Sequence, residues 1–333
     1  MRRTLLVLPL LVALVATAHA QPRAGDTASP EAVVAAGYAS LQRPPGEAYD
    51  WDRDLALFLP QGILIAATGD GFSLWTPTVF SRFVDSYTDP DDPDDPGFAE
   101  WETHQTVHRY GDVAVVFSTY EKALWTSRDD ILGRGVNSHQ LVRRPDGTWR
   151  IVSIVWDEET DETPLPARYG GSGPDTPPRP SPGPTDYATP RSVVDALYET
   201  VQRAPGDHFD WARMRSLFLP QAVLIPNTEQ RGGQFTVETP GAFIALVDRF
   251  TTVGGEGDRG FAEEEVHAVV EQFGDVAHVF STYEKRYYDS DEVLGRGINS
   301  VQLVRHDGRW WIVGMAWDEE DGAGPIPEAY LPD

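Results

Sequence analysis

The chain has 333 residues, enough for two ordinary domains, and its formal net charge is −25 at pH 7. Such a charge repels phosphate backbones and anionic lipid headgroups, which argues against nucleic-acid binding and against attachment to an acidic membrane surface. There is no cysteine, so neither a disulfide nor a lipoprotein anchor is available and stability must come from burial.

Residues 1–20 have the layout of a secretory signal peptide. Arg2 and Arg3 precede an apolar run from Leu5 to Val15, and the small-residue triplet Ala18-His19-Ala20 closes the segment. The run is shorter than the about 20 apolar residues of a membrane-spanning helix, although a retained anchor is the alternative. We therefore expect cleavage before Gln21 and a periplasmic or secreted protein.

Two copies of one sequence follow each other along the chain. Residues 111–122 read GDVAVVFSTYEK and residues 274–285 read GDVAHVFSTYEK. LGRGVNSHQLVR at 132–143 likewise returns as LGRGINSVQLVR at 294–305, and WDEE at 156–159 returns at 317–320. A period this long indicates a duplicated domain rather than a solenoid repeat. We predict domains at 29–169 and 189–330, joined by a linker rich in proline and glycine at 170–188.

Helices are predicted at the start of each copy. Ser29 and Thr189 each precede a proline, as a capping residue does at a helix start. In the first copy a second, short helix is predicted over 50–58, followed by a strand over 63–66. Thr76-Pro77 opens a third helix, whose apolar stripe consists of Val79, Phe80, Phe83 and Tyr87.

Strands are predicted at the end of each copy. In the first copy they cover 98–110, 113–124, 134–143 and 149–157. Asp146-Gly147, like Asp307-Gly308 in the second copy, is a hairpin signal between the last two strands. Helices followed by an antiparallel meander predict an α+β fold, with the helices on one face of the sheet.

This element order, with the closing pattern G-x-N-S-x-Q-L-V-R…D-G-x-W-x-I-V…W-D, resembles the nuclear transport factor two-like superfamily and its SnoaL-like branch. The resemblance covers nearly all of both copies. It implies cone-shaped domains, each a curved antiparallel sheet packed on about three helices around an apolar pocket. It also implies that the two copies pair as an intrachain pseudo-dimer, so that the protein is a monomer. Members include isomerases, dehydratases and cyclases without a cofactor, and binding or assembly modules.

Ketosteroid isomerase chemistry in that superfamily needs an aspartate base on the first strand and a buried acid on a later one. The base would fall near Ala66 in the first copy and Pro226 in the second, and the acid around 139–141, where no carboxylic acid stands. Tyr38 and Tyr198 lie near the position of that enzyme's helix tyrosine. One matching residue cannot perform the reaction, so isomerase chemistry of that type is disfavoured.

Candidate pocket residues come from one face of neighbouring strands. Tyr120 and Tyr283 share a face with serines, and Asn137 and Asn299 lie on the next strand. The predicted ligand-pocket residues are Tyr38, Tyr120, Asn137, His139, Tyr198, Tyr283 and Asn299; the alternative is buried groups bonded to the backbone. Val301 replaces His139 in the second copy, which would leave one active and one supporting domain. No catalytic residue is assigned.

A run of acids and histidines could suggest a metal site. By strict alternation one strand face would carry Glu100, Glu102, His104 and His108, and its repeat Glu263, Glu265, His267 and Glu271. Because the opposite face in the second copy is apolar, we interpret this set as a charged outer face and predict no metal site.

The tryptophans and the remaining acidic segments are expected to have structural rather than functional roles. Trp51, Trp156, Trp211 and Trp317 are predicted to pack in the core. Residues 157–159 and 318–320 are predicted to form a solvated strand edge, and the aspartate-rich run at 89–95 a solvated loop rather than a calcium site. The favoured function is an exported binding or scaffold module for a small apolar molecule; the alternative is a cofactor-free hydrolase, dehydratase or isomerase using Tyr120 or His139.

Overall fold

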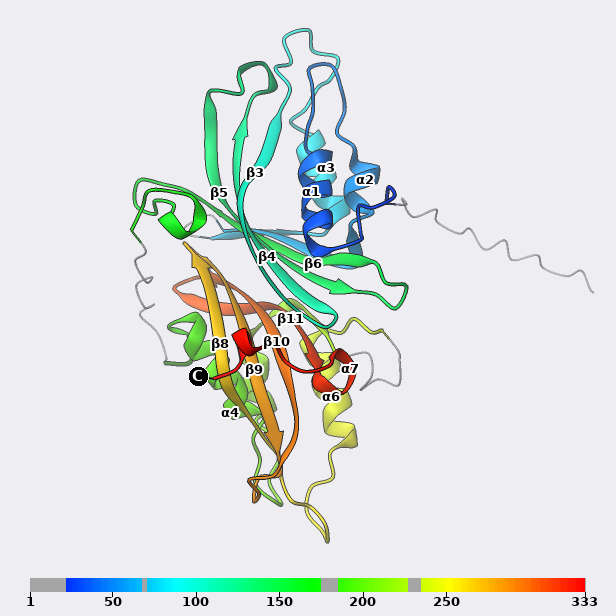
Figure 1. Ribbon diagram of the computed structural model, residues 1–333, viewed down its shortest axis with the longest axis vertical. Helices are drawn as coiled ribbons and strands as arrows, with labels where there is room; N and C mark the ends of the chain where they lie inside the picture. Colours follow the sequence, from blue (N-terminus) through cyan, green and yellow to red (C-terminus); the bar gives the residue numbers. More distant parts are fainter. Residues whose placement is uncertain (1–21, 68–70, 175–184, 227–234, 333) are drawn as a thin grey trace, which may run out of the picture.

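The computed structural model describes residues 22–67, 71–174, 185–226 and 235–332. The predicted signal peptide and most of the predicted linker lie outside this part of the chain. Two sheets meet in the middle of the molecule, and most of the helices lie on their outer sides (Figure 1). The predicted α+β fold with two tandem domains is confirmed. Within the described ranges no helix is long and apolar enough to cross a membrane.

The first domain has a six-stranded sheet in the order β2-β1-β6-β5-β4-β3. Its helices are α1 (Pro30–Ser40), α2 (Trp51–Leu55) and α3 (Pro77–Asp85). Its strands are β1 (Phe58–Ala67), β2 (Phe72–Trp75), β3 (Ala99–Tyr110), β4 (Val113–Ala123), β5 (Ile131–Arg143) and β6 (Trp149–Glu158). The last four are the predicted meander, and β1 adds to it in parallel with β6.

The second domain repeats this arrangement with five strands in the order β7-β11-β10-β9-β8. Its helices are α4 (Pro190–Thr200), α5 (Trp211–Leu217), α6 (Pro240–Phe250) and α7 (Glu320–Ala323). Its strands are β7 (Phe218–Ile225), β8 (Ala262–Phe273), β9 (Val276–Arg286), β10 (Val293–His306) and β11 (Arg309–Glu319). Again the first strand runs parallel to the last, β7 beside β11.

The predicted helix starts and turns have local causes. Ser29 Oγ accepts a hydrogen bond from the Ala32 backbone N–H at 3.2 Å, and Thr189 forms a capping box with Ser192. In the β10–β11 hairpin Asp307 and Gly308 both have positive φ, of 50° and 70°, as a type I′ turn requires.

A β-bulge in β3 sends its two halves to opposite faces. The register with β4 shifts between Glu102 and His104. Before the bulge Glu100 lies opposite Lys122, on the face that carries the helices, whereas His104 and the residues that alternate with it lie on the other face. In β8 the same shift falls between Glu265 and His267. The predicted charged outer face is therefore wrong for Glu100, Glu102, Glu263 and Glu265. It is also wrong for His108 and Glu271, which lie 3.1 Å apart across the contact between the domains and are mostly buried.

The helix-free faces of the two sheets pack against each other. Gln140 Nε2 donates to the carbonyl oxygen of Ser300 at 2.8 Å, and Gln302 Nε2 donates to that of Ser138 at 2.7 Å. Equivalent residues thus exchange equivalent bonds, as in a pair related by an approximate two-fold rotation. One continuous apolar cluster, which includes Phe117 and Phe280, spans both domains.

Two aspartates of the WDEE segments reach across this interface. Asp318 Oδ2 accepts from the Asp112 backbone N–H at 2.8 Å, and Asp157 Oδ2 accepts from that of Asp275 at 2.9 Å. We call these contacts the turn clasps. The predicted solvated strand edge is therefore wrong, and Asp318 is only 6% exposed.

The aspartate-rich loop is anchored at one end. Asp95 accepts two hydrogen bonds from the Arg43 guanidinium, at 2.5 and 2.7 Å, and both side chains are buried. Asp258 makes the same contact with Arg203. The interpretation as a solvated loop is thus wrong for Asp95, which ties the loop to the segment after α1.

Candidate functional site

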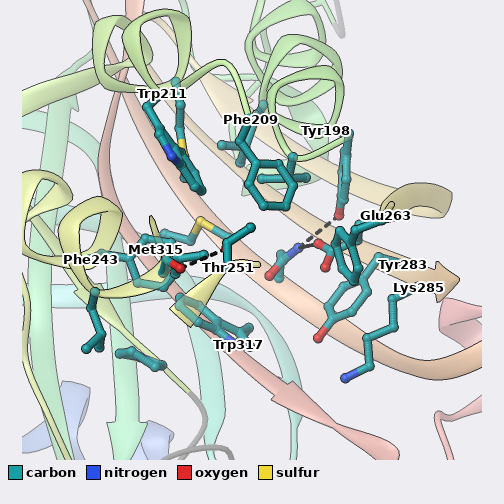
Figure 2. A pocket seen from close by; sticks show the side chains of 18 of the residues that line it. Tyr198, Phe209, Trp211, Phe243, Thr251, Glu263, Tyr283, Lys285, Met315 and Trp317 are labelled. Atoms are coloured by element: carbon teal, nitrogen blue, oxygen red, sulfur yellow. Dashed lines mark hydrogen bonds between the residues drawn. The ribbon is translucent and has the colours of Figure 1, made fainter. Parts of the chain in front are cut away.

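Each domain holds one cavity between its helices and its sheet, of about 420 Å³ in the first domain and about 440 Å³ in the second. The walls are mainly apolar. In the second cavity Figure 2 shows Trp211, Phe243 and Trp317 around the open space, with Tyr198 and Glu263 gathered at one side. The tryptophans Trp156, Trp211 and Trp317, predicted as core residues, are half-buried or buried residues beside these cavities.

The third helix of each domain forms one wall. Phe80 of α3 lines the first cavity, and α6 contributes Phe243, Leu246, Val247 and Phe250 to the second. The predicted apolar stripe of α3 is partly open to solvent, since Val79 is 50% and Phe83 43% exposed, and Tyr87 lies beyond the end of the helix. The stripe therefore borders a cavity rather than filling a core.

All seven predicted pocket residues line the cavities. Tyr38, Tyr120, Asn137 and His139 line the first cavity, and Tyr198, Tyr283 and Asn299 the second. The two tyrosines of β4 and β9 fit because the neighbouring strands have glycine beside them. A Cβ at Gly135 would lie 2.7 Å from Tyr120 Oη, and one at Gly297 would lie 2.5 Å from Tyr283 Oη.

A directed chain of hydrogen bonds leads out of each cavity. Asn137 Nδ2 donates to Tyr38 Oη at 3.1 Å, and the Tyr38 and Ser118 hydroxyls are 2.8 Å apart. Ser118 Oγ donates to Glu102 Oε1 at 2.6 Å, so its single proton is committed and Tyr38 must donate to Ser118. The second domain repeats the chain with Asn299, Tyr198, Ser281 and Glu265.

Glu100 and Glu263 place a carboxyl group in the apolar walls. Removal from bulk water raises the pKa of each to about 7, although an asparagine and a lysine nearby act in the opposite direction. Asn299 Nδ2 donates to Glu263 Oε1 at 3.3 Å. Each group is thus about half ionised at neutral pH, the condition in which a carboxyl group can both take and give a proton.

The lysine in each cavity already has a carboxylate partner. Lys122 pairs with Glu158, and Lys285 Nζ lies 2.5 Å from Glu319 Oε2. Tyr283 Oη also donates to Glu319 Oε1 at 2.9 Å. The lysine charge is therefore largely balanced by a residue other than Glu100 or Glu263.

Two polar side chains occur only in the first cavity. Asp54 of α2 is 9% exposed, and burial raises its pKa to about 6 although the Ser40 hydroxyl lies 3.0 Å from its Oδ1. His139 of β5 is 6% exposed, burial lowers its pKa to about 4, and its Nδ1 has no hydrogen-bond partner. The second copy has Met214 and Val301 at these positions.

Sequence reasoning missed the charged members of both cavities. Lys122 follows Tyr120 by two residues and Glu158 follows Trp156 by two, so alternation could have placed both beside their aromatic neighbours. Glu100 had no such signal, because the bulge reverses the faces of its strand. Among the described residues no group of three His, Cys, Asp or Glu side chains is placed to hold a metal ion.

No family model matches the chain, and no curated protein matches its sequence. Among solved structures it is similar to an NTF-2 like protein of unknown function from Silicibacter pomeroyi DSS-3, at 19% identity over 39% of this chain and 91% of that chain, with a TM-score of 0.27. An NTF-2 like protein of unknown function from Pseudomonas aeruginosa matches at 11% identity over 39% and 98%, with a TM-score of 0.32. A protein of unknown function with a cystatin-like fold from Nostoc punctiforme PCC 73102 matches at 16% over 42% and 96%, with a TM-score of 0.31.

Proposed function

We propose that this chain is an exported protein whose two domains each bind a small, mainly apolar molecule that has a polar end. The observation that carries the proposal is the repetition of one polar set inside two apolar cavities of similar size. Each set consists of two tyrosines, an asparagine, a lysine and two glutamates. A pocket with apolar walls and a few convergent polar groups is the usual form of a small-molecule site.

The binding proposal can be tested with a substitution that the chain itself suggests. Gly37 of α1 lines the first cavity, and the second copy has Leu197 there. A Cβ at Gly37 would meet only Leu57 Cδ1, at 3.9 Å, so Gly37→Leu fills cavity space without a backbone collision. Leucine is also favoured over glycine in a helix by roughly 0.8 kcal/mol, so the variant should remain folded.

The measurement is the unfolding temperature in the presence of a library of small hydrophobic molecules, because a ligand that binds only the folded state raises it. Because the second cavity keeps about 440 Å³ with leucine at this place, Gly37→Leu should change which ligands the first cavity prefers rather than close it. The order of ligand effects at the first cavity should therefore shift, and ligands of the second cavity should keep their effect. A library without a single stabilising ligand would count against the proposal. So would ligands whose effect no cavity substitution changes.

A second function is proposed for the first cavity, cofactor-free acid–base catalysis by a hydrolase, dehydratase or isomerase on a small apolar substrate. The observation that favours it is the presence of Asp54 and His139 in this cavity alone, near Glu100. Glu100 would take a proton from the substrate, and Asp54 in its protonated form would return one. No group of this kind replaces Asp54 or His139 in the second copy.

A substrate screen tests the catalytic proposal. Glu100→Gln should lower turnover at least about 100-fold, the usual contribution of a general base. His139→Val and Asp54→Met install the residues of the second copy and show which of the two takes part. Full activity in His139→Ala would remove the role proposed for that histidine.

Export is supported by the leader-like segment at 1–20 and is tested directly. Expressed from its full reading frame in a bacterium, the protein should be found in the periplasm or the medium with Gln21 as its first residue. A product that stays in the cytoplasm with its first residues intact would contradict export.

A further inference from the structure

The charged residues of each cavity do not balance. The first cavity is lined by Asp54, Glu100 and Glu158 against Lys122, and the second by Glu263 and Glu319 against Lys285. Each lysine is held by one glutamate, Glu158 or Glu319. Glu100 and Glu263 lie opposite Lys122 and Lys285 on the neighbouring strand, but each shares that lysine with the glutamate that binds it. Each cavity thus has more carboxylates than cations, and a carboxylate in apolar surroundings whose charge is only partly balanced is costly.

The walls around these carboxylates are aromatic. The second cavity has eight aromatic side chains, among them Tyr198, Phe209, Trp211 and Phe261. In the first cavity Phe80 meets Trp156 edge-on with the ring centroids 5.9 Å apart, and Trp75 stacks on Trp156 from outside the lining, at 6.1 Å. The negative faces of such rings attract a positive charge, most strongly when it is shielded from water.

One further polar atom in the first cavity is without a partner. His139 Nδ1 makes no hydrogen bond, although the side chain is only 6% exposed and lines the cavity beside Asn137. Burial lowers the pKa of His139 to about 4, so the imidazole is neutral and adds no positive charge that would oppose a bound cation.

From these observations, and resting on the proposed binding function, we infer that each cavity binds an organic cation. The ligand class is a protonated amine or a quaternary ammonium ion on an apolar body, with its positive charge against Glu100 or Glu263 and its body among the aromatic rings. A neutral ligand would exclude water from the same carboxylate without supplying a charge. A metal ion would need several convergent oxygen ligands, whereas most of the wall is carbon.

Binding of benzyltrimethylammonium and of neopentylbenzene, its neutral carbon isostere, tests the inference. The two probes have the same shape and differ in charge. Binding to the full chain is followed by tryptophan fluorescence at pH 8 and 0.15 M salt, because Trp156 and Trp317 line the cavities. We expect two saturable sites per chain, with the cation bound at least tenfold more tightly than the isostere. Tetramethylammonium, which has no apolar body, should bind much more weakly and so reports general attraction to an acidic surface.

Variants separate the cavity from that surface. Glu100→Gln combined with Glu263→Gln should reduce cation affinity at least tenfold, to the level of the isostere. Glu264→Gln changes the same charge on the exposed face of β8, where Glu264 pairs with Arg286, and should have no effect. Lys285→Gln makes the opposite change inside the second cavity and should tighten cation binding there, which provides a test that does not depend on Glu100 or Glu263.

The outcomes distinguish the inference from the function on which it rests. Equal affinity for the two probes, or undiminished cation binding in the double glutamine variant, would overturn the organic-cation inference. If the isostere binds and Gly37→Leu changes its affinity for the first domain only, the proposed apolar binding function survives that failure. If neither probe binds, the organic-cation inference is overturned. If, in addition, no molecule of the hydrophobic library raises the unfolding temperature, the proposed binding function is removed as well.

Discussion

Glu263 is a carboxyl group that folding transfers from water to an apolar wall, and this makes stability depend on pH. Burial raises its pKa from the ordinary glutamate value of 4.5 to about 7. Between these values the folded state holds more protons than the unfolded state, so stability falls as pH rises from about 4.5 to 7 and the loss is complete above 7. At about 1.4 kcal/mol per pKa unit the loss reaches roughly 3 kcal/mol.

We therefore predict that Glu263→Gln is more stable than the parent chain at pH 8 and gains little at pH 5. Urea unfolding at the two pH values measures the difference. Glu264→Gln, on the neighbouring exposed residue, provides the baseline for removing one negative charge. A gain that is the same at both pH values would show that Glu263 is not held away from water.

Asp54 gives a second prediction at this scale. Burial raises its pKa to about 6, so Asp54→Met should stabilise the chain at pH 8, by up to about 3 kcal/mol, and less at pH 5. Ser40 keeps the bond that its hydroxyl proton makes to the Gly37 carbonyl oxygen at 2.6 Å. Asp52→Met on the exposed side of the same helix is the control. A loss of stability in Asp54→Met would mean that the carboxyl group contributes to the fold.

Single residues differed in how well the sequence identified them. Tyr120 and Asn137 could be placed because alternation along β4 and β5 is regular. Glu100 could not, since one extra residue in β3 reverses the faces and nothing in the local sequence marks it. Asp54 was also missed, because a helix of five residues gives no periodic pattern.

At the scale of elements, the turns between β3 and β4 and between β8 and β9 carry the contacts that fix one domain on the other. Gly111 has φ +54°, and a Cβ there would come within 2.0 Å of Asp318 Oδ2, the oxygen that accepts from Asp112. The repeated Gly-Asp of both copies thus has an interdomain reason. Helix starts and hairpins were predictable from local chemistry. The contact between Gly111 and Asp318 was not, because the two residues lie about 200 positions apart in the sequence.

We predict that Gly111→Ala destabilises the chain more than Gly147→Ala does. Both glycines have positive φ, so both substitutions cost about 1 kcal/mol in backbone strain. At Gly147 the added Cβ has no neighbouring atom within 4 Å. At Gly111 the added Cβ collides with Asp318 and must break the turn clasp, at a further cost of about 1–3 kcal/mol. Thermal unfolding of the two variants measures the difference. Equal losses would mean that the clasp adds nothing to stability.

At the scale of the molecule, the two sheets bury each other's helix-free faces. Phe117, Val115 and Phe280 are inaccessible to solvent in this contact. We propose that the chain is therefore a monomer, since the surface through which such a sheet could pair with another chain is already covered. Light scattering should give the mass of one chain. A stable dimer or larger species would contradict this.

The two domains differ at a position in the centre of the contact between their sheets. Ser153 lies opposite Gln140 on β5, and at the equivalent place Gly314 lies opposite Gln302 on β10. A Cβ at Gly314 would come within 2.2 Å of Gln140 Oε1, so the missing side chain makes room for the glutamine that crosses the interface. In the other half of the contact the serine is kept, and Ser153 Oγ donates to Gln302 Oε1. The sequence shows that glycine replaces serine in the second copy. Only the packed sheets show that the glycine leaves space for the Gln140 side chain.

Gly314→Ser should therefore destabilise the molecule by about 1–3 kcal/mol, the usual cost of overpacking a closed interior. Gln140 cannot withdraw freely, because its Nε2 donates to Ser300 at 2.8 Å. Adding Gln140→Ala removes the colliding group, so the double variant should be more stable than the sum of the two single losses predicts, and urea unfolding of all four chains gives this coupling energy. Strictly additive losses would mean that Gly314 and Gln140 do not share space, and would contradict the interface described above.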